Sequence, residues 1–411
     1  MRVGYFDPEG ASPYRSLSWS DVNTLEAQEL AIQSAADALV LTKNDGTLPL
    51  DLAGKKFALI GHWANATTQM LGGYSGVPPF FHNPVAAAQQ LGLSFTYATG
   101  PVNQSTSSTD TWTDRALAAA ATADVILYFG GTDLSVEAED RDRYSIALPG
   151  AQLALVGALS ALGKPLVVVQ LGSLTDDTPL LQNRNVSAII WAGFPGQSGG
   201  TAVFNIISGK QAPAGRLPVT EYPAHYVNDV SLLDMTLRPS ATNPGRTYMW
   251  YNSSVLPFGH GIHYTTFESS LREASTSRTY AIQTLKATCG PETKHPDLCS
   301  FVDIQARVTN KGAKTSDFVA LAFLAGEYGP TPYPVKQLAG YRRLRGVRPG
   351  QTVEVSIAMT LGTLARTDES GNTVLYPGRY KILLDVPTSS ETTFTLTGEP
   401  WVLDFFPQPK A

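Results

Sequence analysis

A chain of 411 residues is longer than one ordinary hydrophobic core supports, so we expect two or three domains. Only 16% of the residues are charged and 43% are hydrophobic, which argues against a disordered chain. The net charge of −5 offers no basic surface to phosphate backbones, and no apolar run reaches the ~18–20 residues that span a bilayer. We therefore expect a globular protein whose partners include neither a nucleic acid nor a membrane.

Residues 1–50 begin as a loop rich in glycine and proline and continue as a helix. Asp21 or Asn23 can cap this helix, which we expect to stop near the turn signal at 44–46. Its apolar side chains recur at helical spacing: Leu25, Leu30, Ile32 and Ala36. The first ~20 residues supply no core and look like the tail of a preceding element.

Residues 51–223 alternate between apolar runs and helical patterns. The expected strands are 57–61, 95–99, 125–129, 166–172 and 188–193, and the expected helices are 84–92, 114–123, 149–162 and 198–209. Continuous Val/Ile/Leu runs separated by helices are typical of a mostly parallel sheet buried on both faces, so we predict an α/β sandwich. No GxGxxG opens the first helix and no Walker A motif is present, so we expect no cofactor.

Polar and aromatic residues follow the carboxyl ends of these strands, where open α/β sheets bind their ligands. Trp63 and Tyr74 follow the first strand. A loop after 125–129 carries five carboxylates and two arginines: Asp133, Glu137, Glu139, Asp140, Arg141, Asp142 and Arg143. Such a loop can supply a general acid or base, or it can be a solvated, self-neutralised surface.

Residues 224–300 read as an irregular linker segment that ends in a loop between Cys289 and Cys299. A metal site needs more ligands than these two, and only His295 lies nearby, so we predict a disulfide and no metal. Disulfides form in oxidising compartments. Four N-x-[ST] sequons point the same way and predict glycosylation: Asn65, Asn103, Asn185 and Asn252.

We therefore expect a secreted, extracellular protein. The opening residues, MRVGYFDPEG, contain neither an apolar core nor a cleavage site of a signal peptide. This conflict suggests that an amino-terminal part precedes the chain.

Residues 301–411 change to the alternation of short β-strands, with turn signals at Asn310, Arg348 and Tyr376. Several alternating strands over about 100 residues without helices predict a β-sandwich.

A series of motifs in this order resembles glycoside hydrolase family 3. They are NDGTLPL (44–50), GHWANAT (61–67), AGFPGQSGGTAVFNIISGKQAPAGRLPVT (192–220), PGRTYMWY (244–251) and PFGHGIHYTTF (257–267). The carboxyl-terminal block, with PVKQLAGYRRLRGVRPGQTVEVSI and YPGRYKILLDV, is similar to the family's fibronectin type III-like domain. EAEDRDR (137–143), with GHWANAT and FGHGIHYTTF, is most similar to the family's fungal β-xylosidases. The resemblance covers essentially the whole chain.

The resemblance implies that a (β/α)8 barrel normally precedes these domains, and that residues 1–50 are its last stretch and exit helix. The family's nucleophile is a barrel aspartate, which no residue of this chain matches. Its general acid/base comes from a loop of the second domain, where Glu137 matches best and Glu139 is the alternative. The resemblance also implies retention of configuration, with the two carboxyl groups about 5–5.5 Å apart.

The function implied is that of the carboxyl-terminal part of an exo-acting xylan 1,4-β-xylosidase, which acts on xylo-oligosaccharides and is inactive or nearly so without the barrel. Tyr74 and Trp63 are candidates for lining the sugar subsite, where Tyr74 would exclude the hydroxymethyl group of glucose. Arg141 and Arg143 are expected to hold the acidic loop through ion pairs. Two alternatives stay open: a non-catalytic carbohydrate-binding or scaffold remnant, and a β-glucosidase of the same family.

Overall fold

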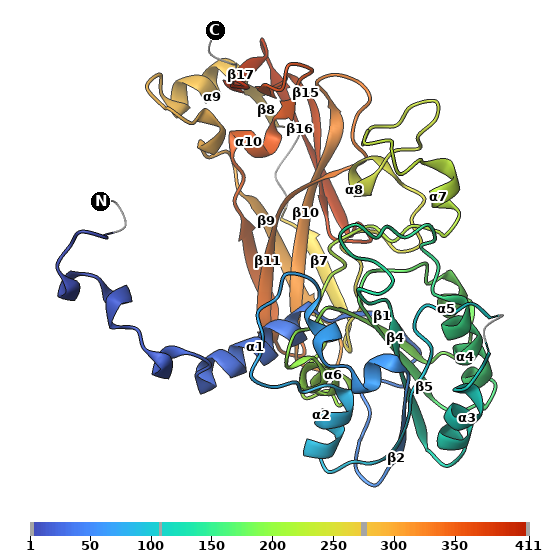
Figure 1. Cartoon of the computed structure of the whole chain (residues 1–411). Coiled ribbons are helices and arrows are strands. Elements are labelled where there is room, and N and C mark those ends of the chain that lie inside the picture. The colour runs from blue at the N-terminus through green and yellow to red at the C-terminus, as the bar shows by residue number, and fades with distance from the viewer. Residues whose placement is uncertain (1–3, 107–108, 273–277, 408–411) are drawn as a thin grey trace.

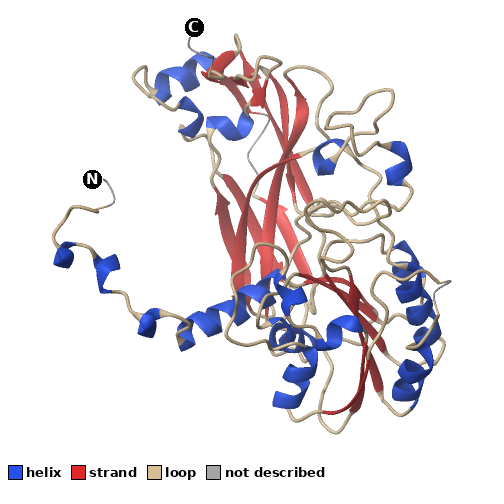
Figure 2. Cartoon of the chain, viewed as in Figure 1, coloured by secondary structure: helices blue, strands red, loops and turns tan. Residues whose placement is uncertain are grey.

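The computed structural model describes residues 4–106, 109–272 and 278–407 (Figure 1). An α/β unit is followed by an all-β sandwich, as the secondary-structure view in Figure 2 shows, and the fold class predicted from the sequence is confirmed.

The α/β unit is built on one six-stranded sheet. Its strands in spatial order are β1 (Val40–Asn44), β6 (Ala188–Gly193), β5 (Leu166–Leu171), β4 (Val125–Gly131), β2 (Lys56–Ile60) and β3 (Ser94–Ala98). β1 runs antiparallel to β6, and the other neighbours are parallel. The five predicted strands are confirmed. β1 was not predicted, because the helix was expected to continue to the turn at 44–46, whereas this helix, α1 (Leu25–Ala38), ends earlier.

Helices cover both faces of this sheet (Figure 1). One face packs on α1 (Leu25–Ala38), α2 (Pro84–Gln90) and α6 (Gly199–Ile207), and the other on α3 (Thr113–Ala121), α4 (Gly150–Ser160) and α5 (Thr178–Gln182). Successive strand residues divide between these two cores: Phe57 and Leu59 join the first, and Ala58 and Ile60 the second. This division explains the continuous apolar strands of the sequence.

The start of α1 differs from the prediction. Thr24, rather than Asp21 or Asn23, caps the helix, and its hydroxyl accepts the Ala27 N–H at 3.1 Å. The short helices η1 (Glu9–Ala11), η2 (Pro13–Ser16) and η3 (Trp19–Asp21) precede α1 and project away from the body of the molecule (Figure 1). Trp19 is 87% exposed there, so this arm contributes no core, as expected.

The segment after α6 is irregular apart from α7 (Tyr226–Asp229) and α8 (Thr247–Trp250). Two other 3₁₀ turns lie much earlier in the chain, after β2: η4 (His62–Asn65) and η5 (Thr68–Leu71). Tyr248 stacks on Phe258 at 4.2 Å between ring centroids, and both rings meet Phe323 of the sandwich at 6.1–6.2 Å. The irregular segment therefore packs between the two units.

The sandwich has two main sheets and a small third one. The first orders β11 (Gln337–Val347), β10 (Ser316–Tyr328), β15 (Gly378–Leu384), β16 (Ser390–Thr397) and β8 (Arg278–Ala281). The second orders β12 (Thr352–Ile357), β9 (Ile304–Asn310) and β7 (Phe267–Leu271), and the third β13 (Arg366–Thr367), β14 (Thr373–Leu375) and β17 (Trp401–Asp404). Three short helices complete it: α9 (Ile282–Cys289), η6 (Pro296–Leu298) and α10 (Leu361–Leu364).

The sandwich begins earlier than the expected boundary at residue 301. β7 pairs with β9 and β8 pairs with β16, so the end of the expected linker, 224–300, belongs to the sheets. These strands are too short, and too polar at Glu268, Ser269 and Ser270, to read as core strands in isolation.

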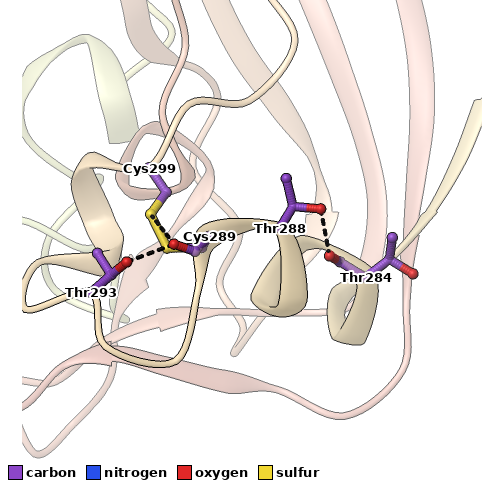
Figure 3. The surroundings of a disulfide bond; sticks show 5 residues. All are labelled: Thr284, Thr288, Cys289, Thr293 and Cys299. Carbon is purple, nitrogen blue, oxygen red and sulfur yellow. Dashed lines mark hydrogen bonds between the residues drawn. A yellow bond between two sulfur atoms is a disulfide. The ribbon is translucent and has the colours of Figure 1, made fainter.

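Cys289, at the end of α9, and Cys299, after η6, form the predicted disulfide (Figure 3). The Thr293 hydroxyl donates to the Cys289 carbonyl at 2.6 Å within the closed loop. The pair therefore closes a local loop, and both cysteines are partly buried and pack against the sandwich core.

Candidate functional site

The carboxyl ends of β2, β4 and β5 lie so close together that only glycine fits. A Cβ on Gly131 would lie 1.9 Å from the Leu171 carbonyl oxygen, and one on Gly172 would lie 1.9 Å from that of Thr132. A Cβ on Gly61 would lie 2.1 Å from the Phe129 carbonyl oxygen. All three have positive φ, which glycine adopts without strain. The chain thus leaves these strands as adjoining loops at one edge of the sheet.

The first carboxylate of the acidic loop is buried and structural. Asp133, 6% exposed, accepts hydrogen bonds from the Ser135 N–H at 2.9 Å and hydroxyl at 2.5 Å. His62 Nε2 lies 3.5 Å from its other oxygen. The contact with His62, together with Ser135, lowers the pKa of Asp133 to about 2 although burial opposes the shift. Asp133 is therefore an anchor for the loop rather than a proton donor.

Glu137 connects the acidic loop to the segment that follows β5. One carboxylate oxygen accepts the Ser173 hydroxyl at 2.8 Å, and the other pairs with Nε of Arg143. Arg143 also donates to the Leu174 carbonyl at 3.1 Å. The Glu137 side chain remains 37% exposed, so this carboxylate is both positioned and accessible.

Glu139 has a different environment. It is exposed, and it accepts a hydrogen bond from the hydroxyl of Tyr74, whose side chain comes from the loop after β2. Tyr74 is 90% exposed. Tyr74 and the acidic loop, 65 residues apart, therefore lie together at the carboxyl edge.

The two arginines of the loop play separate parts. Arg143 forms the expected ion pair with Glu137. Arg141 instead donates to the carbonyls of Leu134 and Ser135, both at 3.2 Å, so it closes the loop on its own backbone.

Trp63 does not line an open site, contrary to the prediction. It is 1% exposed and packs edge-on against Phe194 at 6.4 Å. An aromatic residue after a strand end can turn back into the core, and η4 turns this one inward. Trp63 is therefore a core residue rather than part of the candidate subsite.

Two residues of this edge were not singled out from the sequence. Ser173 follows β5 and Phe194 follows β6, where the same strand-end pattern that pointed to the acidic loop applies. Phe194 is 40% exposed. Serine and phenylalanine are too common for the pattern alone to select them.

A buried carboxyl pair lies beneath the same segment. The Asp177 N–H donates to one Glu221 oxygen at 2.9 Å, and Gln170 donates to the Asp177 carboxyl at 2.6 Å. Asp177 and Glu221 are 0% and 1% exposed, and burial raises the pKa of both.

The sequence also led to predictions about glycosylation, metal binding and membrane spans. The four sequon asparagines, Asn65, Asn103, Asn185 and Asn252, are exposed, and their glycosylation stays a prediction. Among the described residues, no group of three or more His, Cys, Asp or Glu side chains is arranged to hold a metal ion. No helix in that part of the chain is long and apolar enough to cross a bilayer.

Two family models match the chain. Residues 39–264 match the glycosyl hydrolase family 3 C-terminal domain, and residues 318–386 match a fibronectin type III-like domain. An Aspergillus fumigatus protein named "Probable exo-1,4-beta-xylosidase" is 49% identical over 100% of this chain and 53% of its own length. A Neosartorya fischeri protein, also named "Probable exo-1,4-beta-xylosidase", is 48% identical, with the same coverage. The chain spans about half the length of these curated relatives.

Solved structures agree with these matches. A GH3 exo-β-xylosidase in complex with a xylobiose aziridine activity-based probe has a TM-score of 0.92 at 44% identity, over 98% of this chain and 53% of that one. A Listeria innocua β-glucosidase has a TM-score of 0.75 at 20% identity over 95% of this chain and 53% of its own, which shows the shared fold. The chain belongs to glycosyl hydrolase family 3.

Proposed function

We propose that this chain is the carboxyl-terminal part of a retaining exo-β-xylosidase, with Glu137 as the general acid/base. The observation that carries the proposal is the placement of Glu137: it is fixed by Ser173 and Arg143, yet 37% exposed at the ligand-binding edge of the sheet. Glu139 is the less suitable carboxylate, since among the described residues only Tyr74 holds it, on an exposed stretch.

The substrate class is supported by the relatives. Those that are 48–49% identical are named as exo-1,4-β-xylosidases, and the structure that is 44% identical holds a xylobiose-derived probe. We therefore propose terminal β-1,4-xylosyl residues of xylo-oligosaccharides as the substrate. The disulfide and the four exposed sequons support a secreted protein.

In this mechanism Glu137 acts twice. It protonates the glycosidic oxygen while a nucleophile outside the chain attacks the anomeric carbon, and it then removes a proton from the water that releases the sugar. Both Glu137 oxygens have partners in this chain, Ser173 and Arg143. The substrate oxygen therefore shares Glu137 with these partners or displaces one of them.

A chimera tests the proposal. Residues 1–411 replace the matching half of the Aspergillus fumigatus relative, and xylobiose hydrolysis is measured with E137Q and with E139Q as the matched control. We expect E137Q to lower kcat about 100-fold or more, because general acid catalysis contributes about 10²–10⁴. E137Q should lose less of its activity on a nitrophenyl xyloside than on xylobiose, because the nitrophenolate leaving group needs no proton. Unchanged xylobiose hydrolysis by E137Q refutes the assignment.

The isolated chain provides the second test. Without a nucleophile from outside, purified 1–411 should give little or no turnover of a nitrophenyl xyloside. Turnover at rates typical of an enzyme would show that the chain contains a complete active centre and would overturn this part of the proposal.

A further inference from the structure

A cleft of about 450 Å³ lies beside Glu137 and is not used by the mechanism above. Arg143 and Ser173, the two residues that hold Glu137, form part of its lining. The cleft therefore adjoins the acid/base carboxylate, and its size falls within the ~300–1,000 Å³ range of small-molecule sites.

Three aromatic rings line this cleft: Trp191, Phe194 and Tyr222. Two of them are fixed in place. The Trp191 indole donates to the Gly172 carbonyl at 3.2 Å, and the Tyr222 hydroxyl accepts the Thr247 N–H at 2.6 Å while its ring stacks on Tyr226 at 4.2 Å. Because these rings are already held, a ligand would order few side chains on binding.

The third ring is more open. Phe194 is 40% exposed, and its ring packs near Gly72 and Trp63, so one side of it is supported by the protein. Thr220 and Glu221 also line the cleft, and each leaves one buried side-chain oxygen without a partner among the described residues. Aromatic walls with a few polar groups suit a ligand that has apolar C–H faces and hydroxyl edges, as a pyranose has.

We infer that this cleft binds the leaving saccharide of the substrate, with Phe194 as its exposed platform. The inference rests on the proposed function. In a retaining displacement the leaving group departs from the face opposite the nucleophile, toward the acid that protonates it. In the proposed mechanism the nucleophile comes from outside this chain and the acid, Glu137, from within it, so the leaving xylosyl unit lies on the side of this domain.

Binding to the 411-residue chain tests the inference without requiring turnover. Saturation-transfer NMR titrations with xylobiose should give a Kd in the millimolar range. Phe194→Ala should weaken binding about tenfold, the effect of losing one stacking ring. Tyr97→Ala is the matched control, because Tyr97 is 41% exposed on the edge strand β3 and takes no part in the cleft; its Kd should stay unchanged.

A second variant guards against misfolding of F194A. Val219 lines the cleft and is 49% exposed, so Val219→Trp should fill the cleft and abolish binding without disturbing the core. Absence of xylobiose binding, or binding that neither F194A nor V219W changes, overturns the inference and leaves the role of Glu137 untouched. An E137Q chimera that hydrolyses xylobiose normally overturns the proposed function and leaves the binding result standing.

Discussion

Asp37, in the last turn of α1, accepts a hydrogen bond of 2.8 Å from Arg343 on β11, although 306 residues separate them in the chain. Arg345 pairs with the other oxygen of Asp37 at 2.7 Å, and Asp317 pairs with both arginines. The network joins the α/β unit to the sandwich. Its acidic side chains and Arg343 are less than a fifth exposed, so the charges are poorly screened.

We expect Asp37→Ala to destabilise the chain by about 1–2 kcal/mol, because it leaves two guanidinium groups short of an acceptor. The measurement is the urea midpoint followed by fluorescence. Lys381→Ala is the control: its ion pair with Glu391 is exposed, and its loss should cost no more than about 0.5 kcal/mol. Equal midpoints for D37A and the unmodified chain would contradict the network's role.

Gly131→Ala should destabilise the α/β unit by more than about 3 kcal/mol, because it combines a positive φ with a contact that has no room. The new Cβ would lie 1.9 Å from a backbone oxygen of β5. Gly163→Ala separates the two effects. Gly163 also has a positive φ, of 67°, but nothing lies within 4 Å of its Cβ position, so only about 1–2 kcal/mol of strain is expected. Thermal unfolding of both variants checks the difference.

The stability that Asp177 and Glu221 contribute should fall as the pH rises above about 4, the ordinary pKa of a carboxyl in an unfolded chain. Burial raises the pKa of both, so the folded state holds protons that the unfolded state has already released. Glu221→Gln removes one of these groups. The melting temperature of E221Q relative to the unmodified chain should therefore increase from pH 4 to pH 9. Glu268→Gln, at an exposed ion pair, should show no such trend.

Tyr74→Gly tests the proposed basis of sugar preference in the chimera. The φ of Tyr74 is 56°, a conformation that suits glycine, so the replacement should fold normally. If Tyr74 lines the sugar subsite as predicted, removing its ring makes room for the hydroxymethyl group of glucose, and the xyloside-to-glucoside ratio of kcat/KM should fall about tenfold or more. Tyr14→Gly, at a ring that is 79% exposed on the amino-terminal arm, should leave the ratio unchanged. An unchanged ratio in Y74G would remove Tyr74 from specificity.

The central strands could be predicted because two cores require apolar residues at every position. β1 and β7 could not, since Val40–Asn44 and Phe267–Leu271 are short and gain their strand character only from partners far away in the sequence. The position of the acidic loop followed from the end of β4. The ion pair of Arg143 with this loop was also expected, but the contact of Ser173 with Glu137 was not, because Ser173 follows a different strand. The inward turn of Trp63 was likewise set by tertiary packing.

The glycines at the ends of β4 and β5 have a consequence for recognising distant homologues. Gly131 and Gly172 set the spacing at which the two loops leave the sheet, whereas the exposed residues of the acidic loop, such as Glu139, Asp140 and Asp142, can diverge. A domain that keeps this architecture should therefore retain the two glycines after its loop has changed length or lost its carboxylates. Such a pair, one strand–helix–strand unit apart, would identify members that have kept the scaffold and given up the chemistry.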